Sequence, residues 1–298
     1  MIRRIAIIGY GEIGKAIDTI LSQKDGLSIE RWDKDVSKVS DQKSLNNAVH
    51  EADVIFLGVQ SWIHRSVLSD VSPYLQSGAI VVSFAKGIET DSHKTIDQVI
   101  EESLPSDQPF ALCLGPMLAD ELKAGMQGVA VIATRNTHTY DELAELFSGT
   151  MLLVEHSLDV RGIALAGILK NVYAMLLGVV DALGMGLNMK GYFTAKALTE
   201  MRQLLPLLGG RAETVDGIGC LADFVATSYS AYSRNRRFGE EIVRHGKSEV
   251  RGEGIASFES LLALIGKKRE EYPLLSALRT IIIENADAKS AIAACTRS

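Results

Sequence analysis

Cysteine is scarce in this sequence, and its distribution excludes two kinds of site. The three cysteines, Cys113, Cys220 and Cys295, are an odd number at unrelated spacings, without a Cys-x-x-Cys pair. Disulfide frameworks and zinc sites both need cysteines in pairs at characteristic spacings. We therefore expect a protein of the reducing cytoplasm with no metal site, in which Cys113 is a packing residue of an apolar run.

Long hydrophobic runs and a surplus of positive charge are also missing. The longest uninterrupted apolar stretch of the central helix, residues 172–180, falls far short of the roughly 18 residues of a membrane span. The apolar run before Gly9 is too short for the core of a signal peptide. The formal net charge is −6, and the basic clusters lack interleaved aromatic residues. We therefore expect a soluble protein with no membrane insertion and no nucleic-acid partner.

What the chain does contain is a glycine-rich turn between a strand and a helix. A strand pattern at 3–9 leads into Gly9-Tyr10-Gly11-Glu12-Ile13-Gly14, and a helix follows at 15–23. In this context the three glycines permit a tight turn, the approach of a pyrophosphate to the backbone, and close packing of helix on strand. The helix N-terminus offers free N–H groups to the phosphates. The segment predicts a dinucleotide-binding site.

The second strand, 27–32, ends at Asp33, where this fingerprint expects an acidic residue to bind the ribose 2′-hydroxyl. An ionised Asp33 would repel the 2′-phosphate of NADP, so we expect NAD as the cofactor. Arg31 and Lys34 lie nearby and leave NADP possible, and Asp33 can instead simply terminate the strand.

Strand-like and helical patterns alternate through the first half of the 298-residue chain. Apolar runs occur at 53–59, 79–84 and 110–114, and amphipathic stretches at 63–75 and 93–103. This alternation predicts a doubly wound, mostly parallel sheet of the Rossmann type. A hairpin-like pair, 128–133 and 151–155, flanks a helix at 140–147. We place the end of this nucleotide-binding domain at residue 157.

Residues 158–298 are predicted to form an all-helical domain. Asp159 is a plausible N-cap for a long helix that is apolar on nearly all sides of its wheel, and Lys170 and Asn171 interrupt the helix at its middle. A buried ammonium is costly unless it is paired or its pKa falls, so Lys170 is a candidate catalytic residue. A lysine that reaches the helix rim, or that pairs structurally with a carboxylate, fits the same pattern.

The helical domain continues after a break at residues 183–186. Asn188 can cap the next helix, which runs to about Leu205, and later helices are expected at 255–265 and 273–284. Between them lies a polar set that suits a phosphate, because an arginine offers its donors as a planar fork beside hydroxyls and amides. Its members are Asp223, Thr227, Ser233, Arg234 and Asn235. The alternative is a solvated basic turn.

Together these motifs carry a family resemblance. The elements are LKN at 169–171, GLN at 186–188, LTEM at 198–201, T-x-x-G-x-x-x-x-x-D at 214–223 and SRNRRFG at 233–239. In order and spacing they resemble the C-terminal domain of the NAD(P)-dependent glycerol-3-phosphate dehydrogenases. The resemblance extends to the first half. Lys86 would match a lysine that contacts cofactor and substrate, Gly115 and Ala119 would lie along the cofactor, and Glu253 would reach it.

The resemblance implies reversible hydride transfer between C2 of sn-glycerol 3-phosphate and the nicotinamide, a role in phospholipid biosynthesis, and a cytoplasmic homodimer. Lys170 would be the general acid and base, with Asp223 as its orienting counter-charge and Lys86 beside it. Asn171 would hold the substrate hydroxyls, while the phosphate would be bound by Arg234 and Asn235, with Thr227 and Ser233 nearby.

Four positions that bear on the choice of substrate depart from the family pattern, namely Gln60, Leu114, Met117 and Arg251, and Gly252 departs beside Arg251. Two other functions therefore stay open. One is a related dehydrogenase, like those of 6-phosphogluconate or 3-hydroxyacids, that acts on another small phosphorylated or carboxylated compound. The other is a relative that binds NAD without catalysis, against which the complete polar set argues.

Overall fold

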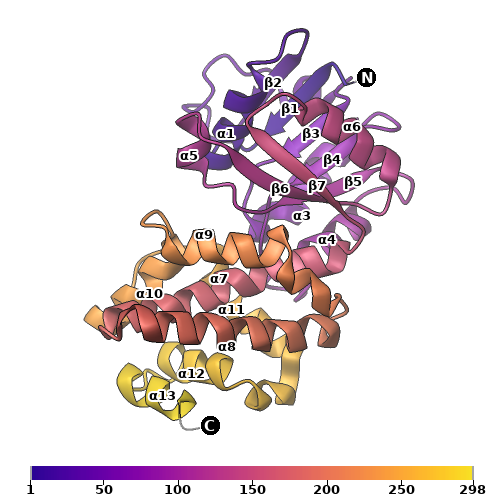
Figure 1. Cartoon of the computed structure of the whole chain (residues 1–298). Helices are drawn as coiled ribbons and strands as arrows, with labels where there is room; N and C mark the ends of the chain where they lie inside the picture. Colours follow the sequence, from indigo (N-terminus) through magenta and orange to yellow (C-terminus); the bar gives the residue numbers. More distant parts are fainter. Residues whose placement is uncertain (1, 297–298) are drawn as a thin grey trace.

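A seven-stranded sheet forms the first half of the protein, in the computed structural model that describes residues 2–296 (Figure 1). The strands lie in the order β2-β1-β3-β4-β5-β6-β7. They are β1 (Arg4–Ile8), β2 (Ser28–Trp32), β3 (Val54–Leu57), β4 (Ile80–Ser83), β5 (Phe110–Leu114), β6 (Gly128–Ala133) and β7 (Leu152–Ser157). The first five pair in parallel, which confirms the predicted mostly parallel sheet.

The hairpin predicted at the end of this sheet is wrong. β6 runs antiparallel to β5, but β7 runs parallel to β6, with Gly128 opposite Leu152 and Ala133 opposite Ser157. Parallel neighbours need a crossover connection, and α6 (Thr137–Phe147) provides it. A helix was already expected between these two strands. A connection that contains a helix is typical of parallel strands and is too long for a hairpin turn.

Helices cover both faces of the sheet, as a doubly wound fold requires. One face packs on α1 (Glu12–Leu21), α5 (Ala119–Lys123) and α6. The other packs on α2 (Leu45–Val49), α3 (His64–Val71), α4 (Ile96–Ser103) and the start of α7 (Val160–Ala182). The short 3-10 helices η1 (Ser61–Ile63) and η2 (Ser72–Tyr74) flank α3, so the predicted helix 63–75 is shorter than expected.

The 23-residue helix α7 is the centre of the second half. The Asp159 side chain accepts a hydrogen bond from the backbone N–H of Gly162 and so caps the helix as predicted. By length and composition α7 could cross a membrane, but it is wholly buried within the protein. Its first turns pack on the sheet and the rest joins the core of the helical half, which places Lys170 at the border between the two.

The remaining helices complete the second half, most of them around α7 and the last at the end of the molecule far from the sheet (Figure 1). They are α8 (Gly186–Leu207), η3 (Ala212–Asp216), the π-helical turn η4 (Ile218–Ala222), α9 (Asp223–Tyr229), α10 (Arg234–His245), α11 (Glu253–Ile265), η5 (Gly266–Glu271), α12 (Pro273–Ile282) and α13 (Ala288–Cys295). Asn188 lies inside the first turn of α8, so it is not the predicted N-cap. The chain turns through Gly184 and Gly186, both at positive φ, and α8 starts two residues earlier than Asn188.

The polar segment of the second half is helical, not a basic turn. Asp223 and Thr227 lie one turn apart on α9, and Arg234 begins α10. Two glycines bring α10 against α7. A Cβ on Gly178 would lie 2.0 Å from the Arg236 carbonyl oxygen, and one on Gly239 would lie 2.0 Å from that of Met175. Only glycine fits both contacts, and the close approach brings the start of α10 beside the middle of α7.

Candidate active site

Three neighbouring cavities follow one another from the glycine-rich turn to the helical half. The first, of about 250 Å³, is lined by Asp33 and Gly11. The second, of about 410 Å³, shares Gly11 with the first and extends to Lys86 and Arg234. The third, of about 210 Å³, shares Lys86 and Arg234 with the second and reaches Lys170. Most of the predicted cofactor and substrate residues therefore line one continuous path, whereas Gly14 and Gly115 do not line these cavities.

The glycine-rich turn fits a dinucleotide. Gly9 has a φ of +90°, and a Cβ on Gly14 would lie 2.3 Å from the Gly9 carbonyl oxygen, so both positions need glycine. A Cβ on Gly11 would meet nothing within 4 Å, and Gly11 lines both the first and the second cavity. The space above it, at the N-terminus of α1, is open for a pyrophosphate. Glu12 and Ile13 line the second cavity from the same turn.

Asp33 lies at the end of β2 and lines the first cavity, as the fingerprint predicts. It is buried, and one of its oxygens accepts a hydrogen bond of 2.8 Å from the backbone N–H of Tyr10. The suggestion that Arg31 could receive a 2′-phosphate is not supported, because its guanidinium forms a two-pronged ion pair with Asp18 at 2.6 and 2.7 Å. Lys34 lines the cavity.

Lys170 and Asp223 form the buried centre of the third cavity. The Lys170 ammonium donates to an Asp223 carboxylate oxygen at 3.0 Å and to the Thr227 hydroxyl at 2.6 Å. Lys86 donates to the other Asp223 oxygen at 2.7 Å and to the Gly115 carbonyl oxygen at 3.1 Å. One carboxylate thus orients two ammonium groups that approach from different halves of the protein. Lys170 does not reach the helix rim; its side chain is only 5% exposed.

This arrangement shifts the pKa values of both Lys170 and Asp223. Burial lowers the pKa of Lys170 to about 8; Asp223 opposes the shift and Lys86 adds to it. Burial alone would raise the pKa of Asp223, but Lys170 and Lys86 outweigh it and the pKa of that carboxyl falls below its ordinary value. Near neutral pH the centre therefore holds an ionised carboxylate and a lysine within reach of titration, as general acid–base catalysis requires.

Two asparagines join the centre to the start of α10. The Asn235 side chain donates to the Asn171 side-chain oxygen at 2.8 Å and accepts from the backbone N–H of Gly254 at 3.1 Å. Both amides are buried and line the third cavity. They therefore fix the first turns of α11 and α10 against the middle of α7.

Arg234 and Ser233 both line the third cavity, but only Ser233 has a side-chain hydrogen bond within the protein. The Arg234 side chain lines the second and third cavities and has no hydrogen-bond partner among residues 2–296. The Ser233 hydroxyl oxygen accepts from the backbone N–H of Arg236 at 3.2 Å and serves as the N-cap of α10. Arg234 thus keeps its donors for a ligand, whereas Ser233 has a structural role already.

Glu253 closes the path from the side of α11. It lines the second and third cavities, and its carboxylate accepts from the backbone N–H of Ser61 at 3.0 Å and from the Ser61 hydroxyl. Burial raises the pKa of Glu253, and the Ser61 donors oppose the shift. A Cβ on Gly87 would lie 2.1 Å from the Ser61 oxygen, so this contact depends on the glycine that follows Lys86.

The four departures from the family pattern fall in different places. Leu114 is fully buried in β5, so it does not face the cleft. Met117 lines the second and third cavities, together with Ala119, and Gln60 lines the first and second. Arg251 is exposed and does not line these cavities. Met117 and Gln60 are therefore the two of these four that can touch a ligand, and Gly252, which also departs from the family pattern, lines the third cavity.

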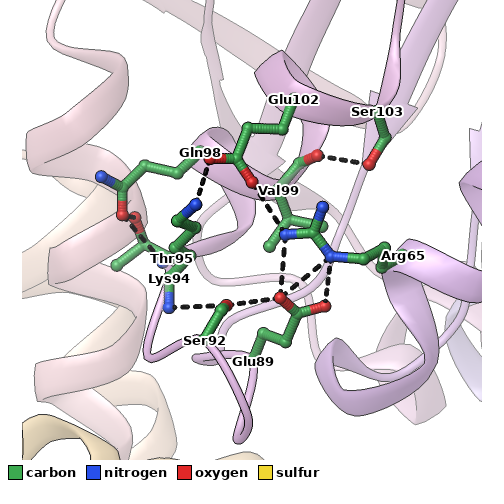
Figure 2. Close-up of polar contacts among 9 residues, drawn as sticks. All are labelled: Arg65, Glu89, Ser92, Lys94, Thr95, Gln98, Val99, Glu102 and Ser103. Atoms are coloured by element: carbon green, nitrogen blue, oxygen red, sulfur yellow. Dashed lines mark hydrogen bonds and ion pairs between the residues drawn. The ribbon is translucent and has the colours of Figure 1, made fainter.

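Sequence reasoning missed an ion pair that positions Lys86. The Arg65 guanidinium of α3 holds Glu89 by contacts of 2.8 to 3.0 Å and also reaches Glu102 of α4 at 3.0 Å (Figure 2). Hydrogen bonds from Arg65 lower the pKa of Glu89 below its ordinary value. Glu89 ends the turn that begins at Lys86, so the pair fixes that turn. Arg65 and Glu89 are 24 residues apart, and no spacing in the sequence indicates their contact.

The fold and the cleft define a class of protein. A doubly wound nucleotide-binding half, a helical half built on a buried lysine-asparagine pair, and a cleft between them are the features of the two-domain nicotinamide-dependent dehydrogenases. The comparisons with known proteins then narrow the class.

Two family models match consecutive parts of the chain. The N-terminal model of NAD-dependent glycerol-3-phosphate dehydrogenase matches residues 34–140, and the C-terminal model matches residues 159–293. A glycerol-3-phosphate dehydrogenase [NAD(P)+] of Nitratidesulfovibrio vulgaris is 31% identical, with 97% of this chain and 96% of the relative covered. One of Agathobacter rectalis is 29% identical, with 97% and 94% covered. The chain belongs to the NAD-dependent glycerol-3-phosphate dehydrogenase family.

Solved structures agree on the fold. The glycerol-3-phosphate dehydrogenase of Coxiella burnetii superposes with a TM-score of 0.87 at 24% identity, over 99% of both chains. That of Plasmodium falciparum gives 0.85 at 18% identity, over 97% of this chain and 94% of the other. At these identities the likeness shows the architecture, and the family membership rests on the sequence relatives.

Proposed function

We propose that this protein is a glycerol-3-phosphate dehydrogenase, which interconverts sn-glycerol 3-phosphate and dihydroxyacetone phosphate with NAD(P). The observation that carries the proposal is the buried Lys170–Asp223–Lys86 cluster, which adjoins the unpartnered Arg234 in a cavity continuous with the dinucleotide cleft. A proton-transfer group and a phosphate-binding group thus lie side by side next to the cofactor path. The sequence relatives carry the same activity in their names.

In this proposal each residue of the cluster has a separate role in hydride and proton transfer. The bound dinucleotide supplies a nicotinamide that accepts or donates hydride. In oxidation, neutral Lys170 accepts the proton of the C2 hydroxyl; in reduction, its ammonium gives that proton to the carbonyl oxygen as negative charge develops there. Asp223 keeps the Lys170 ammonium oriented through the 3.0 Å contact, and Lys86 adds a second positive charge beside the oxygen. Asn171 is placed to bind the substrate hydroxyls.

The pH dependence should follow the titration of Lys170, whose pKa is about 8. Oxidation needs the neutral amine, so kcat/KM for glycerol 3-phosphate should rise with pH through about 8. Reduction needs the ammonium, so kcat/KM for dihydroxyacetone phosphate should fall through the same range. The Asp223→Asn variant removes the charge that raises this pKa, and the midpoint should move to lower pH in any residual activity. Profiles of the two directions with matching slopes would contradict the assignment.

Arg234 should bind the phosphate. Replacing it with alanine removes a charge-assisted pair, so KM for the phosphorylated substrate should rise by about tenfold or more, with a smaller effect on kcat. Arg237 of the same helix is a matched control, because its side chain is 61% exposed and pairs with Glu241. Steady-state kinetics of Arg234→Ala and Arg237→Ala compare the two, and equal KM values would remove Arg234 from the phosphate site.

The direct test of the activity is NADH oxidation, followed by the loss of its near-ultraviolet absorbance with dihydroxyacetone phosphate. The assay is repeated with NADPH and with unphosphorylated dihydroxyacetone. Turnover that depends on the phosphate is expected. Tight cofactor binding without turnover would favour another small phosphorylated or carboxylated ketone as substrate, and Met117 and Gln60 are the replacements that would explain it.

The proposal also covers the roles of the two domains, the oligomeric state and the cellular compartment. Residues 1–157 would bind the dinucleotide and residues 158–298 the substrate, in a soluble, cytoplasmic homodimer that supplies glycerol 3-phosphate for phospholipid biosynthesis. The buried thiols of Cys113 and Cys220 agree with a reducing compartment. Light scattering coupled to gel filtration tests the dimer.

A further inference from the structure

Lys86 belongs to the nucleotide-binding half of the chain, but its side chain lies against the helical half. It is part of the β4–α4 loop, residues 84–95, and its ammonium donates to Asp223 of α9 at 2.7 Å. Its aliphatic stem runs along α7, because a Cβ on Gly167 would lie 3.2 Å from the Lys86 Cγ. The place of this ammonium therefore depends on how the β4–α4 loop is attached to the helical half.

The residues around Lys86 are buried in two different cores. Ala85 belongs to the apolar cluster between the sheet and the helices α3 and α4. Ile88 is 1% exposed and belongs to the cluster that forms the core of the helical half. The chain thus passes from one core to the other within three residues, and Lys86 lies at the crossing.

Ser257 of α11 fixes this crossing through the backbone. Its hydroxyl oxygen accepts a hydrogen bond of 3.0 Å from the backbone N–H of Ile88, and Ser257 is fully buried. Ser260, on the same face of α11, lies with its Oγ 3.0 Å from the Nδ1 of His93 near the far end of the loop. A buried N–H without an acceptor is costly, so the loop needs the Ser257 hydroxyl at this point.

The opposite side of the loop is bound to the nucleotide-binding half. Arg65 of α3 holds the Glu89 carboxylate by contacts of 2.8 to 3.0 Å, and the backbone N–H of Glu89 donates to the Lys94 carbonyl oxygen at 2.8 Å (Figure 2). Two successive residues, Ile88 and Glu89, are therefore held by different halves of the protein. The contact with α11 is the one that ties Lys86 to the helical half.

We propose that Ser257 and Ile88 form an anchor that positions the Lys86 ammonium against Asp223, so that α11 sets the geometry of the proton-transfer centre. Both are positioning residues, since neither lines any of the three cavities and each acts through Lys86. The inference rests on the proposed function, because it concerns the lysine that adjoins the reacting oxygen there. Without the anchor, Lys86 withdraws from Asp223 and leaves that carboxylate to Lys170.

The titration of Lys170 reports the position of Lys86. Burial lowers the pKa of Lys170 to about 8, Asp223 opposes the shift and Lys86 adds to it. Withdrawal of Lys86 therefore raises the pKa of Lys170 toward its ordinary value. The other ionisable groups that act on the two lysines are Asp223, Glu253 and the thiols of Cys113 and Cys220. The Ser257→Ala substitution changes none of these charges.

The test follows the Cε signal of Lys170 by NMR in protein labelled with ¹³C-lysine, so it needs no turnover. The signal is identified by its absence in Lys170→Met. In Ser257→Ala the titration midpoint should rise by about half a pH unit or more, and Ile88→Val should move it in the same direction. Ser276→Ala is the matched control, because it removes a hydroxyl of α12 that donates to the Arg269 carbonyl oxygen at 3.0 Å. Its midpoint should equal that of the wild-type protein.

A double substitution separates positioning from a general loss of stability. In the Lys86→Met background, Ser257→Ala should no longer move the midpoint, because the charge that the anchor positions is gone. A shift of the same size in that background overturns the inference. So does a midpoint within about 0.2 pH units of the wild-type value in folded Ser257→Ala and Ile88→Val.

The anchor and the proposed function fail in different ways. An active enzyme whose Lys170 titration ignores Ser257 contradicts only the anchor. A wild-type protein that binds NADH but does not reduce dihydroxyacetone phosphate contradicts the proposed function, and the NMR titration still decides whether Ser257 positions Lys86.

Discussion

Replacing Lys170 by alanine should lower kcat by about 10² or more in both directions of the reaction while NADH still binds. The side chain is buried in the third cavity, and neither the glycine-rich turn nor Asp33 depends on it. Its ammonium is bound to Asp223 and Thr227, which place it beside the substrate cavity. Alanine removes the proton donor and acceptor from the centre of the third cavity. Stopped-flow measurement of nicotinamide oxidation gives the rate, and nucleotide fluorescence gives the binding.

Lys190 provides a control for the loss of a buried lysine. It is 5% exposed, almost as buried as Lys170, but it pairs with Asp181 at 2.8 Å and lines none of the three cavities. Lys190→Ala should therefore keep kcat within a few-fold once folding has been verified by circular dichroism. If Lys170→Ala also turns over at a near-normal rate, Lys170 is not the acid–base group and the mechanism proposed here is wrong.

Most of the nucleotide-binding half could be predicted because its signals are local. The glycine-rich turn, Asp33 and the buried strands each depend on a few neighbouring residues, and the structure places them as expected. The direction of β7 was mispredicted because it depends on the connection to β6. That connection contains the helix α6, which allows the two strands to run parallel. The preference for NAD was drawn from Asp33 alone, because no sequence pattern indicates that the Lys38 ammonium lies 3.1 Å from each oxygen of that carboxylate.

The candidate site was only partly predictable, for a different reason. Lys170 stood out because a charged residue in an apolar helix is costly, and Asp223 stood out as a member of a polar set in the following segment. Only the family resemblance placed Lys86 beside them, since Lys86 and Asp223 are 137 residues apart and no local pattern joins them. The contact between Ser61 and Glu253, which are 192 residues apart, was not predicted at all. Such pairs exist only once the tertiary fold has closed the cleft.

Asp223→Ala should cost about 3 kcal/mol of the free energy of unfolding near neutral pH. The substitution leaves the ammonium groups of Lys170 and Lys86 close together with no counter-charge, and Lys170 is buried. Breaking a buried pair from one side is costly because the remaining charge is neither solvated nor paired. Deprotonation of Lys170 limits the loss, since its pKa already lies at about 8 and should fall further in the variant.

The sign of the pH dependence follows from both partners. The pKa of Asp223 is lowered in the folded protein, so its contribution is present above the unfolded pKa near 3.8 and is lost as the pH falls through its folded value. The pKa of Lys170 is also lowered, so the cost of its buried charge disappears as the pH rises from about 8 toward the unfolded value of 10.5. The deficit of Asp223→Ala should therefore be largest near neutrality and shrink toward both extremes.

A double substitution separates this charge effect from simple loss of packing. In Asp223→Ala/Lys170→Met the buried charge is gone and the lysine stem is replaced by an apolar chain of similar length, so at least half of the lost stability should return. Lys170→Met alone should cost less than Asp223→Ala, because Asp223 keeps its 2.7 Å contact with Lys86. Urea unfolding of the four proteins at several pH values tests the cycle. If the double variant is no more stable than Asp223→Ala, the cost comes from the cavity left by the aspartate, and the electrostatic account of this centre is wrong.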